Sequence, residues 1–97
     1  MKRYSDELHA EVLRRIEQHQ GEIFRQKEGK EFTYTISGRT ITVEVEGNEP
    51  YPFGLSAIEQ AIELMPAEGP NQLKELRASS RIWAILMDDR IKQGLYW

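Results

Sequence analysis

The stretch that decides the fold is "FTYTISGRTITVEV", residues 32–45, in which two alternating segments flank Gly38 and Arg39. Apolar and polar residues alternate on both sides of this pair with the period of a β-strand. A two-residue turn that begins with glycine is typical of a type II′ hairpin, and it sets Ser37 opposite Thr40. The sequence therefore predicts an antiparallel hairpin over 32–37 and 40–46. In this register the apolar residues share one face: Phe32, Tyr34, Ile36, Ile41, Val43 and Val45.

The segments on either side of the hairpin suggest its neighbours. A helix from Ser5 to about Gln20 is expected because apolar residues recur there at helical spacing, and Gly21 is suited to end it. Residues 22–26 fit either a third strand or an extension of that helix. We favour the strand, because a sheet of two strands is only marginally stable. Residues 46–54 contain two prolines and two glycines and are expected to form a loop.

The second half of the chain reads as short helices. "SAIE", residues 56–59, has the pattern of a capping box with Ser56 as N-cap, and Pro66 ends the helix that follows. A short helix is expected through Leu73 and Leu76. The stretch "RASSRIWAILMDDRI", residues 77–91, predicts a helix capped by Ser79 or Ser80. Apolar side chains would surround most of its axis. We expect this helix, centred on Trp83, to lie in the middle of the core.

These elements predict one α+β domain over 1–97: an N-terminal helix, a small antiparallel sheet, and three or four short helices. The 97 residues leave no room for a second independently folding unit. The absence of cysteine excludes disulfides and thiolate chemistry. No secretory signal or membrane-spanning run is visible, so we expect a cytoplasmic protein.

Two adjacent aspartates, Asp88 and Asp89, are the first candidates for chemistry. In order of preference, one of them caps a following short helix, or either pairs with an arginine at 77, 81 or 90, or the two bind a divalent cation or act as acid and base. Neighbouring helical residues point about 100° apart, which weakens the last reading. The two histidines, His9 and His19, are too far apart along the first helix to share a metal. We therefore predict no catalytic residue, metal or cofactor, and keep a small enzyme using the aspartates as a second alternative.

Nucleic-acid binding is the first alternative function. It would use Arg39 at the hairpin tip together with Arg25, Lys27 and Lys30. The formal net charge of −3 disfavours this reading, because phosphate neutralisation supplies much of the affinity of nucleic-acid-binding domains.

Two aromatic stretches suggest protein partners instead. Tyr51 and Phe53 lie in the proline-rich segment, and Tyr96 and Trp97 end the sequence. Exposed aromatics mark association sites, although the same side chains are equally suited to cover the core of a short chain. The preferred function is a small, non-catalytic, cytoplasmic interaction or regulatory module. It is expected to form a homodimer through a sheet edge or these aromatics, or to bind another protein.

Overall fold

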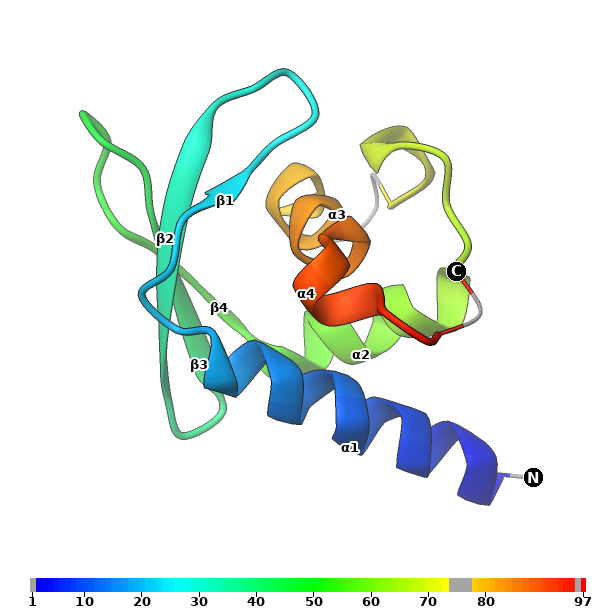
Figure 1. Cartoon of the computed structure of the whole chain (residues 1–97). Helices are drawn as coiled ribbons and strands as arrows, with labels where there is room; N and C mark the ends of the chain where they lie inside the picture. The colour runs from blue at the N-terminus through cyan, green and yellow to red at the C-terminus, as the bar shows by residue number, and fades with distance from the viewer. Residues whose placement is uncertain (1, 74–77, 96) are drawn as a thin grey trace.

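The computed structural model of the chain describes residues 2–73, 78–95 and 97, with side chains from Glu7 onward. It has the predicted α+β order, with a four-stranded antiparallel sheet on one side and the helices on the other (Figure 1). Its elements are α1 (Lys2–Gln18), β1 (Phe24–Arg25), β2 (Glu31–Ser37), β3 (Thr40–Glu44), β4 (Tyr51–Gly54), α2 (Leu55–Leu64), the 3₁₀ helix η1 (Pro70–Leu73), α3 (Ser79–Met87) and α4 (Asp89–Lys92).

The central hairpin has the predicted register. Ser37 lies opposite Thr40, and Tyr34 lies opposite Val43. Gly38 has a φ of +61° whereas the φ of Arg39 is not positive, as a type II′ turn requires. Strand β3 ends at Glu44, earlier than the predicted boundary at 46. The apolar face packs under the helices, which leaves the threonine-bearing face of the sheet uncovered.

The outer strands confirm one expectation and correct another. Residues 22–26 do contribute a strand, shortened to Phe24–Arg25 and paired with Phe32 and Glu31. The predicted loop over 46–54 is wrong in its second half, because residues 51–54 form β4 and pair with β3. A proline is tolerated there because an edge strand does not need every N–H group for pairing.

Three predicted helix starts are wrong. Helix α1 begins at Lys2 rather than Ser5. Helix α2 begins at Leu55 with Gly54 as its N-cap and no side-chain cap, and the Leu55 N–H donates to the carbonyl oxygen of Arg39 at 2.9 Å. Helix α3 follows Ala78, whose left-handed φ of +56° sets the entry of the chain, and neither serine at its start acts as a side-chain cap.

The core lies between the sheet and the helices, and its centre differs from the prediction. Three α3 residues are completely enclosed: Ile82, Ile85 and Leu86. Trp83 is only half-buried at the edge of this layer, where its indole N–H donates to the carbonyl oxygen of Ala67 at 2.9 Å. An indole needs such an acceptor, so the rim suits it better than the apolar centre.

The predicted short helix through Leu73 and Leu76 is described only in part. The 3₁₀ helix η1 includes Leu73, and Leu76 lies outside the described residues.

Candidate binding groove on the open face of the sheet

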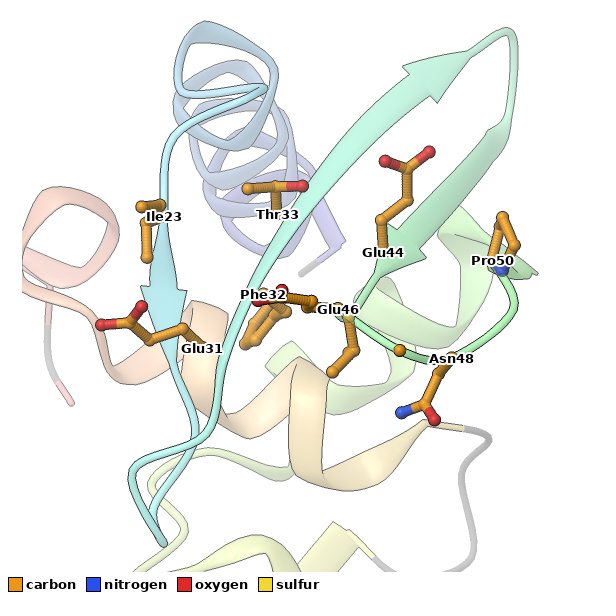
Figure 2. Close-up of a pocket in the computed structure, with 10 residues that line it drawn as sticks. Ile23, Glu31, Phe32, Thr33, Glu44, Glu46, Asn48 and Pro50 are labelled. Atoms are coloured by element: carbon orange, nitrogen blue, oxygen red, sulfur yellow. The ribbon is translucent and has the colours of Figure 1, made fainter.

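A groove of about 510 Å³ lies on the face of the sheet that the helices leave open. Figure 2 shows Thr33, Glu44 and Glu46 in front of the sheet, with the helices behind. They come from the segment before β1, from the start of β2, from the end of β3 and from the loop that leads to β4. Six of the lining residues are Ile23, Glu31, Thr33, Glu44, Glu46 and Pro50.

Strand alternation and one tight turn build this groove. Glu31 and Thr33 occupy outward positions of β2, and Thr33 lies opposite Glu44 of β3. After β3 the chain reverses in a turn in which the Asn48 N–H donates to the carbonyl oxygen of Val45 at 3.0 Å. Gly47 has a φ of +87°, which residues with a side chain rarely adopt. The turn therefore places Glu46 beside the end of the sheet rather than continuing the strand away from it.

The groove is apolar at one wall and acidic at the others. Ile23 is 57% exposed, and it is the large apolar side chain of this hollow that is open to solvent. Glu44 and Glu46 are exposed and make no ion pair or hydrogen bond with any described side chain. Glu31 is partly neutralised, since it accepts a hydrogen bond from Arg25. Among the residues that the structure describes, no lysine or arginine lines the groove, so its carboxylates give it a negative potential.

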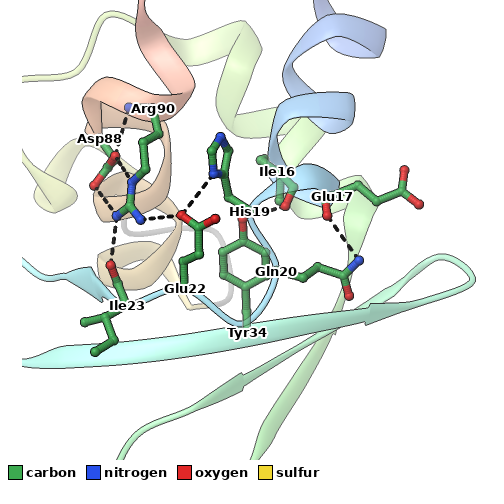
Figure 3. Close-up of polar contacts among 9 residues, drawn as sticks. All are labelled: Ile16, Glu17, His19, Gln20, Glu22, Ile23, Tyr34, Asp88 and Arg90. Atoms are coloured by element: carbon green, nitrogen blue, oxygen red, sulfur yellow. Dashed lines mark hydrogen bonds and ion pairs between the residues drawn. The ribbon is translucent and has the colours of Figure 1, made fainter.

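The wall at Ile23 is held in place by Arg90 of α4 (Figure 3). The guanidinium donates to the Ile23 carbonyl oxygen at 2.8 Å and to the Glu22 carboxylate at 2.9 Å. It forms a bidentate pair with Asp88, at 2.8 and 2.9 Å, and lies 3.9 Å from the centre of the Phe24 ring. These contacts hold both the Ile23 backbone and the Phe24 ring in place. Arg90 of α4 therefore supports this wall of the groove.

Asp88 therefore has a structural role, and the two preferred sequence explanations both hold. It is the N-cap of α4, where its carboxylate accepts from the Arg90 N–H at 2.9 Å, and it also pairs with the Arg90 side chain. The hydrogen bonds that Arg90 donates hold the pKa of Asp88 below its usual value, and the same bonds raise the pKa of Arg90. Asp89 is exposed and does not share this network. Among the described residues, no cluster of three or more acidic, histidine or cysteine side chains could hold a metal.

The histidines are also engaged away from the groove. His9 pairs with Glu63 at 2.8 Å, and His19 Nδ1 lies 3.0 Å from a carboxylate oxygen of Glu22. The pKa of Glu22 is lowered first by the hydrogen bond with His19 and then by that with Arg90. These contacts join α1 to neighbouring segments and place no histidine beside the groove carboxylates.

The residues considered for nucleic-acid binding do not form one basic surface. Arg39 pairs with Glu59 at 3.1 Å, and Arg25 pairs with Glu31. Lys27 lies 5.9 Å from the centre of the Trp83 ring, whereas Lys30 is exposed. Arg39 lies just after the C-terminal end of β2, whereas Lys27 and Lys30 lie before its N-terminal end. At roughly 3.3 Å per residue, this strand of seven residues separates them by about 23 Å.

The aromatic residues considered for partner binding mostly cover this chain's own core. Phe53 is 4% exposed and lies 6.0 Å from the half-buried ring of Tyr51. Trp97 is half-buried, and its indole N–H donates to the carbonyl oxygen of Leu86 at 2.8 Å. Tyr96 lies outside the described residues. Sequence reasoning thus missed the groove.

Features on β2 and on β4 interrupt the regular hydrogen-bonding ladder at the two sides of the sheet. Strand β1 pairs only with the first two residues of β2. Farther along β2, the Tyr34 carbonyl oxygen accepts from the Gly21 N–H at 2.9 Å, and the Ile36 N–H donates to the side chain of Gln20 at 2.7 Å. At the other edge, Pro52 lies in β4 and Pro50 precedes it on the same side of the strand. Because proline lacks an N–H group, this edge cannot offer a regular ladder. Dimerisation through a sheet edge stays a prediction.

Comparison with known proteins identifies no relative: no family model, no curated protein and no solved structure matches this chain. Within residues 2–73, 78–95 and 97, no helix has the length and apolar character needed to cross a membrane.

Proposed function

We propose that this chain is a non-catalytic protein-interaction module whose groove receives a lysine- or arginine-bearing segment of a partner. The observation that carries the proposal is the combination of unpaired carboxylates at Glu44 and Glu46 with the exposed apolar side chain of Ile23 in one hollow. The carboxylates complement a basic side chain, and Ile23 offers apolar area for its methylene stem.

The chemistry of the lining favours binding over catalysis. Its polar side chains are carboxylates, the hydroxyl of Thr33 and the amide of Asn48. A catalytic site would bring a nucleophile or an acid together with a second titratable group of a different character. The aspartates of the enzyme alternative lie in α4 and just before it, and Asp88 is already committed to Arg90.

A partner of opposite charge suits the groove better than a second copy of this chain. The formal net charge is −3, and two such grooves would repel each other. Self-association stays a prediction, for which sedimentation velocity distinguishes 11.3 kDa from twice that mass. The cytoplasmic location likewise stays a prediction.

The proposal is tested by NMR titration of the ¹⁵N-labelled protein with acetylated, amidated hexalysine. We expect backbone amide shifts to concentrate at Thr33, Glu44 and Glu46, and binding to weaken with added salt. Hexaglutamate of the same length should cause no such shifts.

Two double variants separate the groove from general charge. Glu44→Gln with Glu46→Gln should weaken hexalysine binding about fivefold, as expected for the loss of two exposed ion pairs. Glu17→Gln with Glu68→Gln changes the net charge equally at exposed positions on α1 and after α2, and should leave the affinity nearly unchanged. Equal weakening by both double variants, or shifts scattered over the surface, would overturn the proposal.

A further inference from the structure

A second hollow of about 390 Å³ lies between β1 and α3, on the far side of β1 from the groove. Its lining includes Trp83 and Met87, which stand one helical turn apart on α3 and are both half-buried. Arg25, Asp88 and Asp89 also line it. We call it the Trp83–Met87 pocket.

The apolar groups of this pocket suit the side chain of a partner. The Trp83 indole N–H is already bonded to Ala67, so its ring offers apolar and π surface rather than a donor. A flexible methionine thioether adapts to varied partner shapes, and tryptophan is enriched where interfaces concentrate their binding energy. Asp89 is exposed at the rim, and the Arg25 side chain in the lining is paired with Glu31.

The Trp83–Met87 pocket and the groove are adjoining parts of one surface. Glu31 lines the groove, Arg25 lines the pocket, and these two residues face each other across β1 and β2 and form an ion pair. Strand β1 has only two residues, so little backbone separates the hollows. Glu44 of β3 and Arg25 of β1 are two strand spacings apart and two residues out of register, which together give about 12 Å. Three to four residues of an extended chain span that distance, at roughly 3.3 Å each.

We propose that the bound segment is bipartite: a basic residue in the groove and, three or four residues away, a leucine-like apolar residue in the Trp83–Met87 pocket. This inference rests on the proposed function and adds the second recognition element to it. The negative groove selects the basic residue by charge. Burial of the apolar residue against the half-buried Met87 and Trp83 side chains adds binding free energy.

The test uses the full chain with ¹³C-labelled methionine methyl groups and ¹⁵N-labelled amides. The probes are the acetylated, amidated peptides Lys-Lys-Thr-Thr-Leu and Lys-Lys-Thr-Thr-Ser, with both sequences also made in reverse order. In one of the two orders, the leucine peptide should bind about tenfold more tightly than its serine counterpart and shift the Met87 methyl signal. The methyl signal of Met65, which is 5% exposed, is the internal control and should not move.

A variant then isolates the second contact. Met87→Ala should reduce the affinity for the leucine peptide to that for the serine peptide and leave serine-peptide binding unchanged. A general loss of structure would weaken both peptides equally, and the far-ultraviolet circular dichroism spectrum checks the fold. If the variant does not fold, the comparison of leucine and serine peptides on the unmodified chain decides the question.

The outcomes separate this inference from the proposed function. Equal affinity of the leucine and serine peptides, with shifts at Glu44 and Glu46 but none at Met87, would overturn the bipartite segment and leave the basic groove standing. Absence of shifts at Glu44 and Glu46 with every peptide would overturn the groove itself, and the bipartite segment with it.

Discussion

The guanidinium of Arg90 lies 3.9 Å from the centre of the Phe24 ring and hydrogen-bonds to the backbone beside it. Residue 90 belongs to the short helix α4, and residue 24 belongs to β1, the smallest strand of the sheet. A strand of two residues has few ladder hydrogen bonds of its own. The contact with Arg90 therefore supplies stability that local strand pairing does not, and it does so next to the groove.

Replacing Arg90 by lysine should lower the free energy of unfolding by about 1–2 kcal/mol, because lysine keeps the charge but loses the planar fork and the ring contact. Urea unfolding measures this change. Arg14→Lys is the matched control. Arg14 pairs with Glu11 at 2.7 Å on the exposed side of α1, so its replacement should cost less than about 0.5 kcal/mol. Equal effects at the two positions would contradict a special role for Arg90.

Asp88 should make stability depend on acidity. Its pKa is lowered in the folded protein from the ordinary value of 3.8, chiefly by the hydrogen bond from Arg90. The stabilisation is therefore present above the unfolded-state pKa and is lost as the pH falls through the folded-state pKa. Asp88→Asn keeps a capping side chain but removes the charge. Urea unfolding midpoints are measured between pH 2.5 and 7 for the variant and the unmodified protein. The variant should be less stable near neutrality, and the difference in stability between the two proteins should close as the pH falls below about 3.8.

Some of the acid dependence should survive in that variant, since the pKa of Glu22 is lowered as well and acts in the same direction. A constant difference between the Asp88→Asn variant and the unmodified protein over the whole range would show that the charge of Asp88 contributes nothing.

Tyr34 joins the sheet to α1 through a hydroxyl that donates to the Ile16 carbonyl oxygen at 2.6 Å. Tyr34→Phe should lower the free energy of unfolding by about 1 kcal/mol in urea at neutral pH. Burial raises the pKa of this phenol, so its neutral form is favoured in the folded state. Stability should thus fall as the pH rises above about 10, where tyrosine ionises in the unfolded chain. The phenylalanine variant should show a smaller alkaline loss, and an unchanged loss would argue against the buried position.

Two leucines of equal size test where the core lies. Leu86 is completely enclosed, whereas Leu64 is 52% exposed on α2. Leu86→Ala should lower the free energy of unfolding by about 2–5 kcal/mol, because it leaves a cavity. Leu64→Ala should change it by less than about 0.5 kcal/mol. Chemical denaturation of both variants gives the comparison, and similar losses would place the centre of the core elsewhere.

The sequence alone determined those features whose cause is local. The hairpin register follows from a glycine turn and from strand alternation, two signals that lie within a few residues and agree. The cap at Asp88 is likewise a contact with a backbone group two residues away. The inward face of the hairpin was predictable for the same reason, since Tyr34, Ile41 and Val43 share one side of a regular strand.

Only the tertiary structure decided the features that depend on distant partners. Strand β4 forms because β3 is there to pair with it, although its prolines favour a loop when read alone. Helix α2 begins at Leu55 rather than after Ser56, and its first N–H group donates to the Arg39 carbonyl oxygen of the hairpin turn. Ile23, Glu44 and Glu46 line the same groove although they are distant in sequence, and the turn at Gly47 sets the position of Glu46 in it. Residues separated by so much chain are brought together by the packing of whole elements, which short-range patterns do not specify.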